Sequence, residues 1–197
     1  MKDIDSLRKS LETAIKTLPE VFYSTFQYTK TGNNLTHPIT VGLIAAAVRK
    51  LPRVKFVGID VKLNEGGSKF YPDVVAFSSI DNEMVPLLIV DYESPNSSDM
   101  RIPKKDVAAY RKWVSRSGHE NVPYVIITTL PDSESKHWQL RYTTKLNASV
   151  KSKKSKAEMR RNPKAFWYKI YKQKITSKLP KDVYFLNISE KDVQRIR

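Results

Sequence analysis

The spacing of apolar residues divides the chain into helical and extended segments. Apolar residues recur every three or four positions in four segments, which predicts four helices. The predicted helices cover residues 3–18, 38–51, 101–116 and 164–178. The first two are followed by a proline and the third by Gly118, and both residue types commonly end helices. The polar stretch 29–36, rich in Thr and Asn, is expected to be a loop.

Alternating or wholly apolar runs predict the strands. The predicted strands cover residues 54–63, 69–78, 85–93, 122–129, 138–145 and 183–188. The sequence NEGG at 64–67 predicts a hairpin turn between the first two. A short aromatic run at 22–28 is compatible with one more strand, and the residues after 188 with a final helical turn. This order of elements predicts an α/β fold, a mixed central β-sheet flanked by helices.

Length and composition limit the class of protein. We expect 197 residues to form a single domain (1–197), with a core at 20–145 and a basic C-terminal extension at 146–197 packed on it. No apolar run approaches the roughly 18 residues of a membrane-spanning helix, and the N-terminus does not resemble a signal peptide. A cytoplasmic protein without a membrane partner is therefore expected. The chain has no cysteine, so any metal must be held by oxygen or histidine, which favours Mg²⁺ or Mn²⁺.

The net charge of +15 indicates a polyanionic partner. Between residues 151 and 180, nine Lys and two Arg stand against one acid, so most of the excess lies in this segment. DNA, double-stranded by preference, is the expected partner; an anionic membrane, a protein, or a basic surface with no partner are the alternatives. The residues expected to contact phosphates are Lys151, Lys153, Lys154, Lys156, Arg160, Arg161 and Lys164.

Acidic residues gather on two neighbouring predicted strands. Asp73 and Asp91 lie symmetrically about residue 82 in the polar turn that joins these strands. An antiparallel hairpin would therefore bring them close together. Glu93 shares the parity of Asp91 and projects from the same face. Three carboxylates are thus expected to meet at one end of a sheet, shortly before the pair Lys104 and Lys105.

Such a cluster is costly unless it binds a cation, because neighbouring carboxylates raise one another's pKa. Mg²⁺ held there would activate a water and neutralise charge on a phosphate, and a nearby lysine would stabilise the developing charge. The alternative for each acid is a solvated strand end or a partner for one of the many lysines. The whole set, in this order on a basic chain, favours phosphodiester hydrolysis.

The motifs resemble those of the PD-(D/E)xK nuclease superfamily, and within it the Uma2-like group of endonucleases. The matching features are Pro72-Asp73-Val74, Asp91-Tyr92-Glu93-Ser94-Pro95, Asp99, Lys105, Tyr110, Gly118, VPYVIITTL, and His37-Pro38-Ile39 upstream. The resemblance implies a restriction-endonuclease-like core and a Mg²⁺-dependent (or Mn²⁺-dependent) deoxyribonuclease. It also implies that Asp73 and Asp91 are metal ligands, with the backbone carbonyl of Tyr92 as a further one.

Two positions depart from the superfamily pattern. Glu93 stands where the signature has lysine, so either Glu93 is an added ligand or proton acceptor, or Lys105 (or Lys104) on the helix takes the lysine's role. Upstream, Glu20 is a weak match to an acid that many members use. A catalytically inactive DNA-binding protein on the same fold and an RNA-associated basic protein are therefore the alternatives. Paired cuts would need two active sites, which makes a homodimer one expectation.

Overall fold

The computed structural model describes residues 2–16, 30–93, 102–119, 121–128, 157–158, 161, 181–188 and 192–195. Its helices are α1 (Lys2–Ile15), α3 (Lys30–Arg49) and α4 (Ile102–Ser117). Its strands are β1 (Phe56–Ile59), β2 (Leu63–Glu65), β3 (Ser68–Phe70), β4 (Val74–Ile80), β5 (Glu83–Glu93), β6 (Tyr124–Thr128), β7 (Val183–Ile188) and β8 (Val193–Arg195). The predicted α/β class with a mixed sheet is confirmed.

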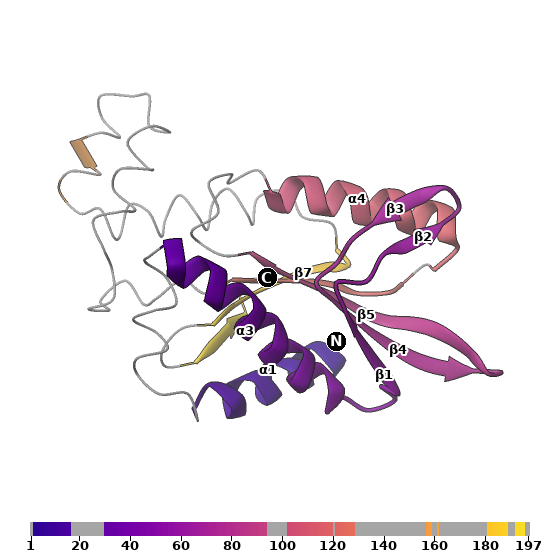
Figure 1. Ribbon diagram of the computed structural model, residues 1–197, viewed down its shortest axis with the longest axis horizontal. Helices are drawn as coiled ribbons and strands as arrows, with labels where there is room; N and C mark the ends of the chain where they lie inside the picture. The colour runs from indigo at the N-terminus through magenta and orange to yellow at the C-terminus, as the bar shows by residue number, and fades with distance from the viewer. Residues whose placement is uncertain are drawn as a thin grey trace.

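Six strands form the central sheet in the order β1-β4-β5-β6-β7-β8 (Figure 1). β1, β4 and β5 form an antiparallel meander, β5, β6 and β7 run parallel, and β8 returns antiparallel to β7. The parallel step from β5 to β6 is made through α4, as parallel pairing requires a crossover. β2 and β3 form a separate two-stranded hairpin.

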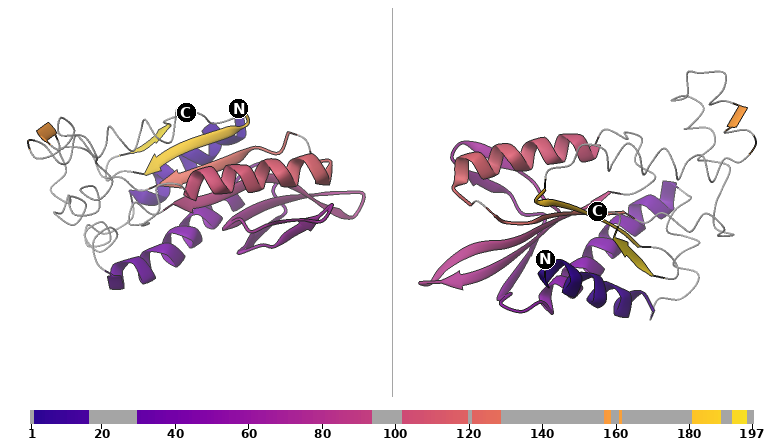
Figure 2. Two further views of the ribbon diagram at one scale, coloured as in Figure 1. Left: turned by 90° about the horizontal axis from the view of Figure 1, so that it is seen from above. Right: turned by 180° about the vertical axis from the view of Figure 1, so that it is seen from behind.

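The helices cover the sheet from both sides, with α4 on one face and α1 and α3 on the other (Figure 2). Under α4 lies an aromatic core that includes Tyr110, Trp113 and Tyr124, and the β2–β3 hairpin closes it. Under α1 and α3 lies an aliphatic core that includes Ile44 and Val90. Both faces of β5 and β6 are therefore buried, which accounts for their continuous apolar runs.

The β4–β5 hairpin carries a β-bulge that sets its register. Its turn is formed by Asp81 and Asn82, both with left-handed φ angles (50° and 65°). Beyond Phe77↔Pro86 the pairing shifts by one residue, so that Ala76 faces Leu88 and Val74 faces Val90. Pro86 has no N–H to give to the ladder, and such residues occur in strands mainly at edges and bulges. The shift aligns position 73 with position 91 (by continuation of the register), as the symmetry about residue 82 predicted.

Four sequence expectations were wrong, one of them the strand 69–78, which is interrupted between Phe70 at the end of β3 and Val74 at the start of β4. Residues 30–36, expected to be a loop, belong to α3, which runs through Pro38. Helix propensity is a weak prior that other interactions override, and here it misplaced the start of the helix. The predicted strand 54–63 is split after Ile59 by Asp60, which has a φ of 52°. The tail forms β8 rather than a helical turn, because Val193 pairs with Ile188 and is buried.

Several expectations lie outside the described residues. These are the strands at 22–28 and 138–145 and the helix at 164–178. The C-terminal residues that are described supply β7 and β8 to the central sheet. Among the helices that the structure describes, none is long and apolar enough to span a bilayer.

Candidate active site

Two hydrogen bonds join Asp73 to Asp91 and to its neighbour Tyr92 on the adjacent strand. The backbone N–H of Asp73 donates to Oδ1 of Asp91 at 2.8 Å. The backbone N–H of Tyr92 donates to Oδ2 of Asp73 at 2.7 Å. Asp73 immediately precedes β4, where the chain leaves the β2–β3 hairpin, and Asp91 lies near the C-terminal end of β5. The predicted proximity of these two carboxylates is confirmed.

The carboxylates lie on the face of the sheet that α4 covers. Asp91 has the parity of Ile89, which packs in the aromatic core, and Glu93 follows on the same side. Asp91 is only 6% exposed. Its Oδ2 accepts a hydrogen bond from the hydroxyl of Tyr124 on β6, a fully buried side chain. The Asp91 carboxyl is therefore held from both sides by protein donors.

A fourth acid, Asp106, joins the cluster from α4. Its carboxyl forms a hydrogen bond with Glu93, and its charge acts on Asp73 and Asp91. The helical spacing of α4 indicates this position. Asp106 stands four and seven residues before Tyr110 and Trp113, so it lies on the stripe of α4 that faces the core. An acid on such a stripe must meet a polar partner.

Burial and mutual repulsion keep protons on this cluster. Burial raises the pKa of Asp91 to about 7, and the hydrogen bond from Tyr124 opposes part of that effect. Burial, followed by the hydrogen bond with Asp106 and its charge, raises the pKa of Glu93 to about 10. The pKa of Asp73 is also raised by burial, against the hydrogen bond from Tyr92 and the nearby His37. Near neutral pH the four acids therefore carry fewer than four negative charges.

His37 contacts the cluster from the other face of the sheet. Its Nε2 lies 3.6 Å from Oδ1 of Asp73, and its side chain is 46% exposed. The imidazole also lies against the ring of Tyr92, with centroids 5.5 Å apart. The helix was predicted to begin at residue 38, whereas His37 lies inside α3 and contacts Asp73.

The predicted lysines are only partly placed. The backbones of Lys104 and Lys105 lie in the first turn of α4. Lys105 stands one turn before the half-buried Ala109, whereas Lys104 stands one turn before the exposed Ala108. Lys104 also stands three residues before the buried Val107, so the helix phase does not choose between the two lysines. Of the predicted phosphate-binding residues, Arg161 is described and exposed.

The rest of that predicted set lies outside the described residues. These are Lys151, Lys153, Lys154, Lys156, Arg160 and Lys164. Asp99 and Glu20, two acids that entered the family comparison, are outside them as well.

The donor chemistry of the cluster fits Mg²⁺ or Mn²⁺. All four acids offer hard oxygen ligands, and the Asp73 side chain is 19% exposed, so solvent reaches it. Within the residues that the structure describes, no three His, Asp or Glu side chains are arranged to hold one metal ion. Binding a cation therefore requires carboxyl groups to exchange their present hydrogen bonds for the metal and to release the protons they share.

Replacing Tyr124 by Phe tests the hydrogen bond that the Tyr124 hydroxyl donates to Asp91. The variant removes the donor to a buried carboxyl, and we expect a loss of about 1–3 kcal/mol in the free energy of unfolding. The loss should be larger at pH 8 than at pH 5, since the bond is stronger when Asp91 is ionised. Urea denaturation at both pH values measures it. Tyr184→Phe, which keeps the ring under Arg195, is the control and should change stability little. Equal losses of unfolding free energy at the two pH values would contradict a hydrogen bond from Tyr124 to an ionisable Asp91.

Comparisons with known proteins do not identify the chain. No protein-family model, curated protein or solved structure matches it. The geometry of the carboxylate cluster is therefore the main observation bearing on function.

Proposed function

We propose that this protein is a metal-dependent endonuclease that hydrolyses phosphodiester bonds of DNA. The observation that carries the proposal is the hydrogen-bonded pairing of Asp73 with Asp91 and Tyr92 at a solvent-accessible end of the sheet, with Glu93 and Asp106 beside them. Buried acids that repel one another are costly to keep without a compensating cation. A strongly basic chain supplies the attraction for a polyanionic substrate.

Asp73 and Asp91 are the residues that would hold Mg²⁺, with the backbone carbonyl of Tyr92 as a further ligand. The chemistry that the bound ion supplies is activation of a water and neutralisation of charge on the scissile phosphate. Tyr124 orients Asp91 through its hydroxyl. Because burial and the hydrogen bond with Asp106 raise its pKa, Glu93 would hold a proton that it could exchange beside Asp91. Lys105, in the first turn of α4, would act on the phosphate.

The order of elements around the site supports a restriction-endonuclease-like core. The succession α3, β1, β4, β5, α4 and β6 surrounds the cluster, with a helix on each face of the sheet. Asp73 follows Pro72 at the entry to β4, and Asp91-Tyr92-Glu93 ends β5. These are the positions at which the resemblance to PD-(D/E)xK nucleases places the metal-binding acids.

The second candidate is a catalytically inactive DNA-binding protein on the same fold. Two observations favour it: Glu93 occupies the position of the signature lysine, and the described acids are not arranged to hold a metal ion together. In this protein the proton shared by Glu93 and Asp106 would be permanent, and the cluster would have only a structural role.

Calorimetric titration with Mn²⁺ at pH 7.5 separates the two candidates. The nuclease binds Mn²⁺ at millimolar concentration or below, and it releases protons, so the measured heat changes with the ionisation enthalpy of the buffer. The inactive protein shows salt-sensitive DNA binding but takes up no metal. A competition assay in which RNA displaces DNA would instead favour an RNA-associated protein.

A further inference from the structure

The connection from α3 to β1 concentrates positive charge. Residues 49–55 read RKLPRVK and contain four cations and no acid. All four cationic residues are exposed. They are Arg49, Lys50, Arg53 and Lys55. This segment is separate from the basic stretch 151–180, and we call it the 49–55 turn.

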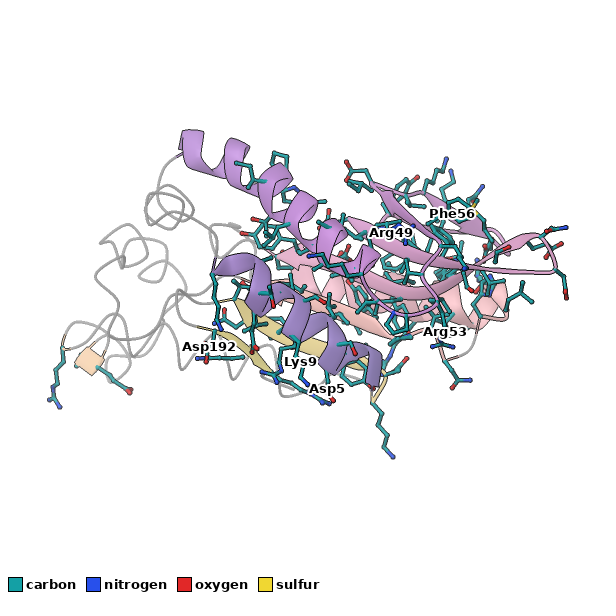
Figure 3. All side chains as sticks on the ribbon, turned by 90° about the horizontal axis from the view of Figure 1, so that it is seen from below. Asp5, Lys9, Arg49, Arg53, Phe56 and Asp192 are labelled. Atoms are coloured by element: carbon teal, nitrogen blue, oxygen red, sulfur yellow. The ribbon has the colours of Figure 1, made fainter. Side chains whose placement is uncertain are left out.

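The 49–55 turn has a defined structure. A guanidinium N–H of Arg49 donates to the carbonyl of Val54 at 3.0 Å. Arg53 holds a left-handed φ of 68°, and the N–H of Lys55 donates to the carbonyl of Phe77 at 2.8 Å. Figure 3 labels Arg49 at the end of α3 and Arg53 on the connection that follows. The cations are thus carried on a fixed backbone beside β1.

Helix α3 joins this turn to the carboxylate cluster, because His37 on this helix contacts Asp73 and Arg49 is its last residue. Gly42 and Ala46 are exposed and lie roughly 140–180° around the helix axis from His37, on the side turned away from the sheet. A Cβ added at Gly42 would meet nothing within 4 Å. The twelve residues from His37 to Arg49 span about 18 Å at 1.5 Å per residue. The turn therefore lies about 18 Å along the helix from the point where α3 contacts Asp73.

Strand β1 gives an independent measure of the same separation. The N–H of Asp60 donates to the carbonyl of Asp73 at 2.9 Å, so Asp60 lies at the cluster. From Asp60 back to Lys55 the extended chain covers about 17 Å at 3.3 Å per residue. Both estimates correspond to about five base pairs of DNA at 3.4 Å per step.

We propose that the 49–55 turn binds the phosphate backbone of duplex DNA, about five base pairs from the bond at the carboxylate cluster. This inference rests on the proposed nuclease function for its cutting point. Stabilisation of the α3 dipole does not account for the whole cluster of charge. Arg49 and Lys50 lie at the C-terminal end of the helix, where cations are favourable, but Arg53 and Lys55 lie beyond it.

The salt dependence of DNA binding tests the inference. The double variant Lys50→Gln/Lys55→Gln is compared with wild type on a 20-base-pair duplex in EDTA, by fluorescence anisotropy over a series of salt concentrations. Two lost phosphate contacts should lower the slope of log K against log salt by about 1.8. The matched control is Arg111→Gln/Lys112→Gln, an equal charge change on the exposed side of α4, which should leave the slope unchanged. An unchanged slope in the first variant, or an equal fall in both, overturns the proposal.

A second pair of variants tests the surface beside the turn. Ala46→Glu places a negative charge one helical turn before Arg49 and Lys50 and should weaken duplex binding about tenfold, by repulsion of the phosphates. Gly42→Ala adds one methyl group in open space and should leave binding unchanged. Loss of binding to anionic vesicles but not to DNA would overturn the proposal in favour of a membrane partner.

The outcome is distinguishable from that of the nuclease proposal, because binding is measured without metal. If wild type cleaves DNA and the lysine variant keeps the wild-type salt dependence of DNA binding, the nuclease proposal stands and the proposal for the 49–55 turn is wrong. If wild type does not cleave DNA and the lysine variant shows a weaker salt dependence of DNA binding, the proposal for the 49–55 turn stands and the nuclease proposal is wrong.

Discussion

Asp73→Asn is expected to lower the kcat/KM of Mg²⁺-dependent DNA cleavage at least about 10³-fold. Loss of a ligand to the metal removes several kcal/mol of transition-state stabilisation, and each 1.36 kcal/mol is worth tenfold in rate. The amide oxygen of Asn can still accept the hydrogen bond from the N–H of Tyr92, so the hairpin should remain folded. Binding of a DNA duplex in EDTA should therefore stay within about twofold of wild type.

The matched control is Asp81→Asn at the tip of the same hairpin. Asp81 has a left-handed φ of 50°, a conformation that Asn adopts readily, and its side chain is exposed. Cleavage by this variant should equal that of wild type. An Asp73→Asn protein that retains a tenth or more of the wild-type rate would show that Asp73 does not bind the essential metal.

Glu93→Gln is expected to stabilise the metal-free protein at pH 8 by roughly 5 kcal/mol. In the folded wild type the pKa of Glu93 is raised to about 10, from 4.5, so folding requires this carboxyl to take up a proton at pH 8. Its contribution to stability is complete below pH 4.5 and falls as the pH rises toward 10. Glutamine needs no proton and can still form a hydrogen bond to Asp106.

Thermal unfolding in EDTA between pH 5 and pH 9 measures this effect. The melting temperature of wild type should fall with rising pH, and Glu93→Gln should exceed it by about 10–20 °C at pH 8 but by little at pH 5. Glu83→Gln, at an exposed position on the same strand, is the control and should follow the wild-type profile. If Glu93→Gln shows the same decline as wild type, Glu93 does not hold a proton in the folded protein.

The sequence located the two central acids because strand geometry is strict. Side chains alternate with a period of two, so the parity of Asp91 and Glu93 determined their common face. The alignment of position 73 with position 91 across the hairpin depended on more than the alternation of side chains. The turn at Asp81–Asn82 alone would place Val90 opposite position 73, and one extra residue near Pro86 restores the register. The symmetry about residue 82 gave the right pairing without revealing the bulge that produces it.

Other parts of the site depend on contacts that local patterns do not specify. Asp106 was missed because it follows two lysines at the head of a helix, where an acid appears to be an ordinary surface residue. Its helical spacing to Tyr110 and Trp113 was the available signal. The contact of His37 with Asp73 depends on how α3 crosses the sheet, and the sequence suggested a helix that began at Pro38. Propensity around Gly32 and Asn33 pointed to a loop, although both lie in the helix.

The central claim is that the carboxylate cluster cuts DNA with the help of a divalent metal. Incubation of purified wild-type protein with supercoiled plasmid, with Mg²⁺ or Mn²⁺ and in parallel with EDTA, tests it most directly. We expect nicked and then linear plasmid to accumulate with either metal, and the plasmid to stay supercoiled in EDTA. A plasmid that stays supercoiled with both metals, or that is cut equally in EDTA, would contradict the claim.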